Sequence, residues 1–212
     1  MTDDVIEHLR NNGARLRAKA LFRDPGDSLS VRIPGREGFL FMTPDRPDPT
    51  AFPFATTGVE AADLHARIYR SRDDAGGVLI GQTQWSSALA SIGARVPTLF
   101  DEQARHIGPA GRPIAAGRHS RLLRALEDGR NVAIYGERRI CIGTTPSRVV
   151  FNAELFEKCA KAFVITHAGG DRIRKLPLWV RYIARARLRR DQKRAALSYA
   201  AGRIPERMDA YF

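Results

Sequence analysis

Apolar residues near the N-terminus recur at helical spacing and then change to the alternation of a strand. Val5, Leu9 and Leu16 lie among charged residues, which predicts an amphipathic helix over Asp3–Ala20. Leu29–Ile33 alternates between apolar and polar positions and predicts the first strand of a sheet. The N-terminal part therefore indicates a helix that leads into β-structure.

The following segment predicts a hairpin and then a loop. Pro34–Gly38 has the composition of a turn, and the apolar run Phe39–Met42 returns as the partner strand. Thr43–Thr57 contains four prolines. Because proline cannot donate a backbone hydrogen bond, we expect this segment to be a loop.

The rest of the chain alternates between helical and strand patterns. We expect helices at Glu60–Arg70, Ser86–Ile92, around Asp101–His106, at Ser120–Leu126 and from Pro146 toward Thr166, and strands at Gly77–Gly81, Asn131–Tyr135 and Arg139–Ile142. No repeat or internal linker interrupts the order. The pattern favours one α/β domain over residues 1–170, followed by a basic C-terminal helical arm over residues 171–212.

Composition limits the class of protein. A chain of 212 residues that is 43% hydrophobic can bury a full core without disulfides. Its two cysteines, Cys141 and Cys159, fit a reduced intracellular setting. The N-terminus has no apolar signal region, and no apolar run approaches the length that spans a bilayer. We therefore expect a cytoplasmic protein without a membrane partner.

The formal charge of +12 is concentrated toward the C-terminus. Residues 171–212 hold twelve Arg and Lys against four Asp and Glu. Such a block could attract nucleic acid or anionic lipid. A solvated helix or a subunit-contact arm is favoured here, because the block carries no nucleic-acid-binding module and no interleaved stacking aromatics.

The run from Glu60 to Ala90 carries the most specific pattern. The predicted helix is followed by a short connection and then by a buried strand that begins with Val78 and Leu79. This run resembles the signature region of the class II aldolase/adducin family, in which a YxxRPDAxAVVH-like segment feeds a strand with two metal-binding histidines as H-x-H. The matching positions are His65, Tyr69, Arg72, Asp74 and Ala75.

The resemblance extends over about Val5 to Gly170 and implies a fold. Gly26–Arg32 is similar to the family's glycine turn, and the segment from Gly143 to Phe163 is similar to its long helix. The implied fold is an α/β three-layer sandwich, with a central mostly antiparallel sheet flanked by helices. The implied assembly is a homo-oligomer, usually a C4 tetramer.

The three metal-ligand positions implied by the resemblance are Ile80, Gln82 and Glu137. Isoleucine has no donor atom, and a neutral amide is a poor ligand for a zinc-type ion. We therefore expect no metal and no other cofactor. The positions that cradle phosphate in the family carry Asp27 and Asp45 here, and a carboxylate repels phosphate at close range. This favours an unphosphorylated substrate.

Polar residues nevertheless persist around the former metal positions. Glu137 lies at a bend between two strands, and Glu60 falls one residue from the family's catalytic glutamate, so these two are the candidate catalytic residues. The candidate substrate-binding residues are Gln82, Thr83, Gln84, Tyr135, Arg32 and Thr43. A core position is expected for His65, and a surface cluster on a short helix for His106.

Three functions are compatible with this pattern. The first is a metal-independent enzyme that acts on a small molecule by general acid–base chemistry, as a lyase, isomerase or cyclase. The alternative is a non-catalytic, adducin-like scaffold or regulatory subunit. A weaker third hypothesis is nucleic-acid association through the basic arm.

Overall fold

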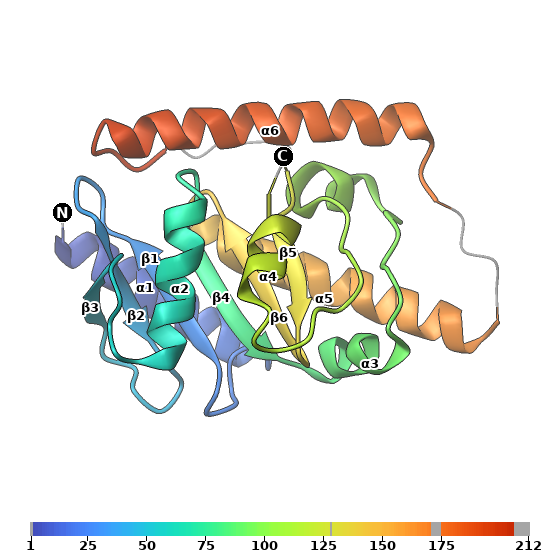
Figure 1. Ribbon diagram of the computed structural model, residues 1–212, viewed down its shortest axis with the longest axis horizontal. Coiled ribbons are helices and arrows are strands. Elements are labelled where there is room, and N and C mark those ends of the chain that lie inside the picture. Colours follow the sequence, from blue (N-terminus) through green and yellow to red (C-terminus); the bar gives the residue numbers. More distant parts are fainter. Residues whose placement is uncertain (1, 128, 171–174, 206–212) are drawn as a thin grey trace.

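The computed structural model describes residues 2–127, 129–170 and 175–205, and it contains one six-stranded antiparallel sheet (Figure 1). The strand order across the sheet is β3-β2-β1-β4-β6-β5. The strands are β1 (Ser28–Arg32), β2 (Gly38–Met42), β3 (Thr50–Pro53), β4 (Gly77–Gln82), β5 (Val132–Tyr135) and β6 (Arg138–Gly143). The expected α/β architecture with an antiparallel central sheet is confirmed.

Seven helical segments surround the sheet in the described part of the chain. They are α1 (Thr2–Ala18), α2 (Glu60–Ser71), α3 (Gln84–Ile92), the short π-helix η1 (Gln103–Ile107), α4 (His119–Ala125), α5 (Pro146–Ala168) and α6 (Leu178–Ala200). The bounds of α1 to α5 and η1 lie within a few residues of those that the periodicity predicts, and α6 lies inside the helical arm expected over residues 171–212. Among the described helices, none combines the length and the apolar character that crossing a bilayer requires.

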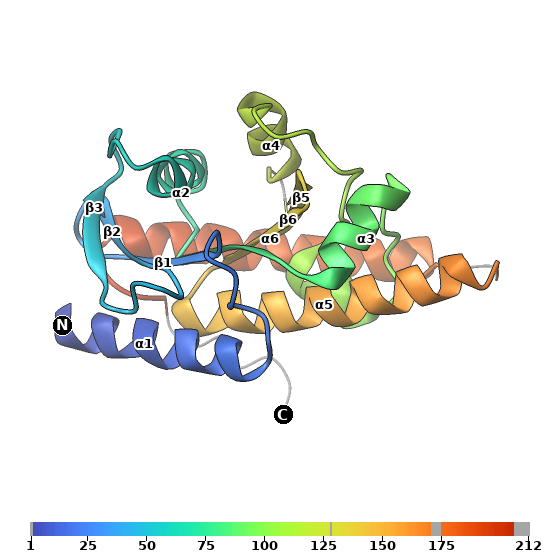
Figure 2. The ribbon, with the colours of Figure 1, turned by 90° about the horizontal axis from the view of Figure 1, so that it is seen from below.

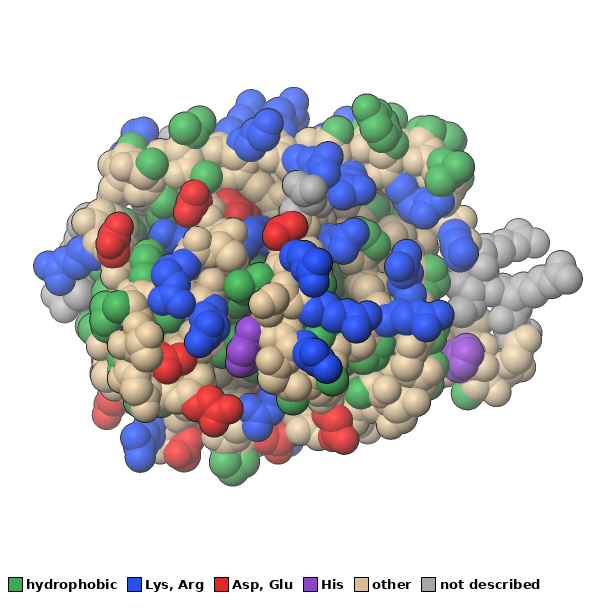
Figure 3. All heavy atoms as spheres, viewed as in Figure 1, with side chains coloured by type: hydrophobic (Ala, Val, Ile, Leu, Met, Phe, Trp, Pro, Cys, Tyr) green, Lys and Arg blue, Asp and Glu red, His purple; other side chains and the backbone are tan. Residues whose placement is uncertain are grey.

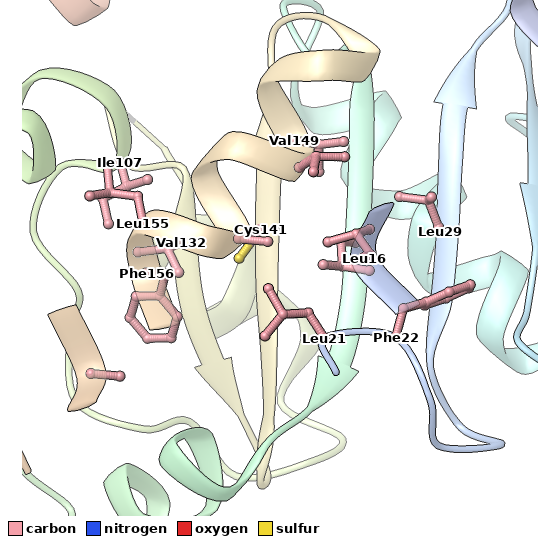
Figure 4. Packing of buried hydrophobic residues seen from close by; sticks show 14 of the residues in the cluster. Leu16, Leu21, Phe22, Leu29, Ile107, Val132, Cys141, Val149, Leu155 and Phe156 are labelled. Atoms are coloured by element: carbon pink, nitrogen blue, oxygen red, sulfur yellow. The ribbon is translucent and has the colours of Figure 1, made fainter. Parts of the chain in front are cut away.

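Helices cover both faces of the sheet, and each face has its own core. Figure 2 shows α1 and α5 on one side of the strands and α2 and α4 on the other. On the α1/α5 face, Leu16, Leu29 and Cys141 pack with Val149 and Phe156 (Figure 4). Their complete burial removes a large apolar area from water and is the main source of stability of this layer.

The α2/α4 face is richer in aromatic and polar groups. The rings of Phe39 and Tyr69 are tilted against each other with centroids 5.2 Å apart, and Phe39 stacks beside His65 at 6.2 Å. Phe41 meets the same histidine edge-on at 5.3 Å. This face therefore combines apolar packing with buried hydrogen-bonding groups.

The expectation of a loop over Thr43–Thr57 is wrong at β3. Thr50–Pro53 pairs with β2 at the edge of the sheet, with Phe52 opposite Phe39. The Phe52 ring lies 6.0 Å from that of Phe39 and 5.7 Å from that of Phe41. Proline is tolerated because an edge strand leaves one row of backbone groups unpaired.

The arm helix α6 packs on its own chain. Ala184, Leu188 and Ala195 are buried, and α6 lies against η1. The Tyr199 hydroxyl donates to the carbonyl of Thr144 at 3.0 Å. This helix therefore packs on the core of its own chain. Figure 3 shows Lys and Arg side chains gathered along α6 and on the adjoining surface of the same face.

Candidate functional site

The polar candidate residues gather where β4 ends and the β5–β6 hairpin turns. Gly136, with φ +59°, and Glu137 form the two-residue turn, and the glycine supplies the positive φ that such a turn requires. Gln82 pairs with Arg138, which in turn pairs with Tyr135. Directly opposed residues share a face of an antiparallel sheet, so this row of side chains points to the α2/α4 side.

The amide of Gln82 connects this row to Glu137. Its Nε2 donates to Oε2 of Glu137 at 2.8 Å and to Oγ of Ser87 at 3.0 Å. The hydroxyl of Ser86 donates to the backbone carbonyl of Glu137 at 2.7 Å and fixes the turn on α3. Glu137 itself is exposed. The structure thus brings the predicted site residues Gln82 and Glu137 together at the surface. Ser87, which was not among the predicted site residues, joins them through Gln82.

The side chain of Asp27 holds the backbone at the end of β4. Its Oδ1 accepts the backbone N–H of Gln82 at 2.9 Å, and its Oδ2 accepts those of Arg23 and Asp24 at 2.9 and 3.1 Å. Burial raises the pKa of Asp27, and the three backbone N–H groups oppose that rise. The carboxylate is 1% exposed. Asp27 therefore positions Gln82, and the expectation that it faces a ligand in the phosphate pocket is wrong.

Thr83 and Gln84 have different surroundings. Thr83 is the N-cap of α3, and its hydroxyl donates to Oε2 of Glu157 at 2.9 Å. Glu157 belongs to α5, on the opposite face from Gln82. Gln84 is exposed on the first turn of α3. Thr83 thus anchors the helix, whereas Gln84 lies at the surface beside the predicted site.

Glu60 and Thr43 lie at the same end of the sheet as Gln82. His65 contacts Ser28 at the start of β1, which pairs with β4 near Gln82, so the N-terminus of α2 with Glu60 extends beyond this end. Thr43 follows directly after Met42, which pairs with Leu29 near the same end of β1. Both residues therefore lie at the same end of the sheet as Gln82. Figure 1 shows the start of α2 and the end of β4 at one edge of the molecule.

Arg32 is not brought into this group. It lies beyond the pairing of Val31 with Gly77, at the other end of β1. Its guanidinium donates to the carbonyls of Ala75 at 2.7 Å and Arg72 at 2.9 Å. It also lies within 5.3 Å of the ring centroids of Phe54, Tyr69 and Tyr199. Arg32 holds this opposite end of the sheet together.

Tyr135 has partners that the sequence analysis did not find. Its hydroxyl accepts the backbone N–H of Gly117 at 2.6 Å and lies 3.0 Å from Nδ1 of His119. Both partners come from the segment before and at the start of α4. His119 was one of several scattered histidines, and no spacing rule connects it with a residue sixteen positions later. The pair lies on the same face as Gln82.

The signature residues His65 and Tyr69 form a buried network with β1. The two ring nitrogens of His65 lie 2.8 Å from Oγ of Ser28 and 2.7 Å from Oγ of Ser30. The Tyr69 hydroxyl lies 2.8 Å from the same Ser30 oxygen. Burial lowers the pKa of His65 to about 3, so the ring is neutral. The expected core position of His65 is confirmed.

Arg72 and Asp74 form a second buried connection. The guanidinium of Arg72 makes two bonds of 2.7 Å to the carboxylate of Asp74. It also donates to Oδ1 of Asn131 at 2.8 Å, and Asn131 accepts a further bond from Gln192 of α6 at 3.0 Å. This motif therefore joins α2, the start of β5 and the arm helix. Its role here is structural.

His106 is buried, and the expectation that it belongs to a surface cluster is wrong. It is 8% exposed, and its ring meets that of Phe151 edge-on at 5.1 Å. Nη1 of Arg148 lies 3.3 Å from its Nδ1. Burial, Arg148 and Arg105 lower its pKa to about 4. α5 and η1 enclose the imidazole, which the local sequence could not show.

The donor set does not fit a histidine-bound metal. Ile80 is 3% exposed and belongs to the apolar core, and the amide of Gln82 donates to its two neighbours. Within residues 2–127, 129–170 and 175–205, no three His, Cys, Asp or Glu side chains gather as a metal site would require. Tyr135, rather than Glu137, shares the sheet face with these two positions.

Several solved structures share this architecture. An L-fuculose 1-phosphate aldolase aligns with a TM-score of 0.75 at 17% identity, over 88% of this chain and 96% of its own. YgbL from Escherichia coli gives 0.71 at 16% identity, over 86% and 98%. An aldolase II superfamily protein from Pseudomonas syringae gives 0.61 at 17% identity, over 86% and 83%.

These similarities establish a class II aldolase-like fold. The resemblance noted in the sequence is thereby supported at the level of the fold. No protein-family model and no curated protein sequence matches the chain. At identities below one fifth, the shared fold does not carry over an activity.

Proposed function

We propose that this protein is an enzyme that transfers protons on a small unphosphorylated molecule, in a lyase, isomerase or cyclase reaction. The observation that supports it is the contact between Gln82 and Glu137. A carboxylate and an amide, separated by 55 residues in the chain, meet at the end of β4. These are positions that the sequence resemblance assigns to metal ligands, and their replacements are polar and accessible.

Each group has a defined chemical capacity. The carboxylate of Glu137 can remove a proton from a carbon next to a carbonyl group. Both N–H groups of the Gln82 amide are engaged with Glu137 and Ser87, so its Oε1 can accept a bond from a substrate hydroxyl. Glu60, at the same end of the sheet, supplies a second carboxylate for the return of the proton.

The preference for an unphosphorylated substrate rests on nearby negative charge. Hydrogen bonds from the Thr43 hydroxyl and from its own backbone N–H lower the pKa of Asp45, so this group is a carboxylate at neutral pH. With Glu60 and Glu137 it contributes three carboxylates to this end of the sheet, which also carries Arg46 and Arg138. A phosphate dianion placed next to these carboxylates would be repelled by them.

The proposed reaction also calls for a site that is closed to water. Glu137 and Gln84 are exposed in the single chain, whereas proton transfer from carbon benefits from exclusion of water. We propose that the chain assembles as a homo-oligomer, a tetramer by resemblance, in which a neighbouring copy covers this end of the sheet.

A non-catalytic scaffold is the second candidate. Two cavities among the described residues lie elsewhere, one between α5, η1 and α6 and the other around Arg32 and Tyr199. Neither is lined by Glu60, Gln82 or Glu137. A scaffold would keep the fold and need no pocket at these residues.

Hydrogen–deuterium exchange at carbon separates the two candidates. The full chain is incubated in deuterated buffer with EDTA and a panel of unphosphorylated hydroxyketones and oxo acids, with L-fuculose 1-phosphate as the phosphorylated contrast. We expect exchange by NMR with at least one unphosphorylated compound. Glu137→Gln should reduce its rate by about 10²–10⁴-fold, the range for a general base.

Glu7→Gln is the matched control, because Glu7 is exposed on α1, which covers the other face of the sheet. It should leave the rate unchanged. Equal rates for Glu137→Gln and the unaltered chain would remove Glu137 from the mechanism. No exchange with any compound would favour the scaffold.

A further inference from the structure

The helix α6 has two sides with different surroundings. Its inner side, which carries Ala184, Leu188 and Ala195, is buried against the rest of the chain, and the helix packs on η1. Side chains half a turn away from these positions face outward. Figure 1 shows α6 along one edge of the molecule, with the sheet and the other helices on its inner side. The outer side of α6 is therefore part of the molecular surface.

The first turns of α6 expose large apolar side chains on this outer side. Leu178, Trp179 and Tyr182 are 76%, 68% and 77% exposed, and Ile183 is exposed as well. Leu197 follows Trp179 by about five turns, so it lies in the same row along the helix, and it is also exposed. Single exposed apolar residues are common on proteins. A group of them on neighbouring turns marks a surface that contacts another molecule or a membrane.

Basic residues continue the same outer side. Arg190 follows Trp179 by about three turns, and Lys193 follows Tyr182 by the same spacing, so each pair lies in one row. Both basic residues are exposed. The single acidic residue of α6, Asp191, is buried and forms an ion pair with an arginine of η1. The outer side of α6 thus combines apolar groups and positive charge, and the helix adds no exposed carboxylate to it.

This combination favours an anionic lipid surface over other kinds of partner. Tryptophan and tyrosine prefer the boundary between the headgroups and the acyl chains of a bilayer, where aliphatic side chains also insert. Arginine and lysine are attracted to the negative charge of anionic lipids. A nucleic acid would leave Leu178, Ile183 and Leu197 without apolar partners. The same side of a second copy would bring Arg190 and Lys193 close to their own equivalents, and like charges repel.

The length of α6 suits a planar partner. At 1.5 Å per residue, its 23 residues extend over about 34 Å. The apolar and basic residues of the outer side are spread along this length. A bilayer can contact all of them at once, whereas a small molecule reaches only one part of the helix. Figure 3 shows hydrophobic side chains and Lys or Arg side chains along the edge where Figure 1 draws α6.

We propose that the outer side of α6 binds the surface of a membrane that contains anionic phospholipids. The side chains of Leu178–Ile183 that face outward insert among the headgroups, and Arg190 and Lys193 contact the lipid phosphates. The expectation of no membrane partner rested on the lack of a long apolar run, a criterion that applies only to segments that cross the bilayer. The proposal does not depend on the proton-transfer reaction.

Vesicle binding by the full chain tests the assignment. Sedimentation is measured with vesicles of phosphatidylcholine alone and of phosphatidylcholine with about one-third phosphatidylglycerol. We expect binding to the anionic vesicles, weakened by added salt, and little binding to the neutral ones. Tryptophan emission should shift to shorter wavelength as Trp179 leaves water. Trp179→Phe should abolish the shift, because the other tryptophan, Trp85, lies on α3.

Charge variants measure the electrostatic part of the binding. Arg190→Gln together with Lys193→Gln should weaken binding to anionic vesicles by roughly 30-fold, about 5-fold for each charge near the surface. The matched control is Arg95→Gln together with Arg121→Gln. It removes the same charge from exposed positions after α3 and on α4. The control should change the affinity by less than about 2-fold, because charges away from the contact are screened.

An apolar variant separates insertion from attraction by charge. Trp179→Ser together with Tyr182→Ser should weaken binding by about 10-fold or more without a change in charge, because the aromatic groups that favour the interface are lost. Both positions are exposed. Circular dichroism of this variant should therefore match that of the unaltered chain.

Several results would overturn the proposal. The first is a folded chain that does not bind the anionic vesicles. The second is a control variant that weakens binding as much as the α6 charge variant, which would reduce the interaction to general attraction by a basic protein. Unchanged binding by Trp179→Ser with Tyr182→Ser would exclude insertion. A lower subunit number of that variant in light scattering would assign this side to a contact between copies.

A single-stranded oligonucleotide serves as the competing partner. If the chain binds it more tightly than the anionic vesicles, and the α6 variants lose that binding, the outer side of α6 belongs to nucleic acid and the lipid assignment is rejected.

Discussion

Two polar groups on the same sheet face differ in what surrounds them. Around His65, the hydroxyls of Ser28, Ser30 and Tyr69 satisfy each other inside the core. At the end of β4, Gln82 and Glu137 bond to each other at the surface. The hydrogen bonds in the two networks have similar lengths. Only the network around His65 is buried away from water.

The difference separates residues that maintain the fold from residues that are available for chemistry. The positions that keep the aldolase pattern, including Arg72 and Asp74, are buried and bonded within the structure. The positions that depart from it, Gln82 and Glu137, lie at the surface end. A motif can thus persist because it builds the scaffold, while the reactive end changes.

Removing a partner from the buried ion pair should have the largest effect. Arg72→Ala leaves the carboxylate of Asp74 without its guanidinium partner and removes one of the two donors to the amide oxygen of Asn131. We expect a loss of about 3–5 kcal/mol in the free energy of unfolding, measured by urea denaturation. Arg67→Ala, on the exposed side of α2, should change it by less than about 0.5 kcal/mol. A small loss for Arg72→Ala would mean that the pair is not a structural centre.

Acid should destabilise the fold through His65. Its pKa is about 3 in the folded chain against 6.5 as a model value. Between these pH values the unfolded chain takes up a proton that the folded chain refuses, so stability is complete above about pH 6.5 and falls as the pH drops toward 3. The contribution is on the order of 3–5 kcal/mol. Denaturation curves from pH 7 to pH 4 should be less pH-dependent for His65→Gln; an unchanged slope would place the imidazole in contact with water.

The smallest effect on stability is expected at the exposed network. Glu137→Gln retains an oxygen that can accept from the Gln82 amide, and the side chain is exposed. The free energy of unfolding should change by no more than about 0.5 kcal/mol. Thermal denaturation of Glu137→Gln, measured together with the exchange assay, would show whether the variant loses activity while it keeps its stability. A large loss of stability would place Glu137 among the residues that hold the fold.

Much of the layer structure could be predicted from the sequence. Apolar spacing located the helices from Asp3–Ala20 onward, and the turn at Pro34–Gly38 indicated the β1–β2 hairpin that the structure contains. The burial of His65 followed from its place on the apolar side of α2. These features depend on residues within a few positions of one another, and such local patterns can be recognised from the sequence alone.

The site could be predicted only in part. Gln82 and Glu137 were selected, and they meet; Ser87 and the supporting Asp27 carboxylate were not recognised in those roles. Arg32 was selected for the site and lies at the far end of the sheet. Spacing along the chain does not show at which end of the sheet a residue of a strand will lie.

The sequence by itself determined which segments form helices and strands and which of their sides are apolar, because periodicity is a property of neighbours. Only the tertiary structure decided that β3 joins the sheet edge, that η1 and α5 bury His106, and that α6 packs on η1. These outcomes depend on strand register and helix packing between distant segments. Their free energy comes from contacts that exist only when the whole chain has folded.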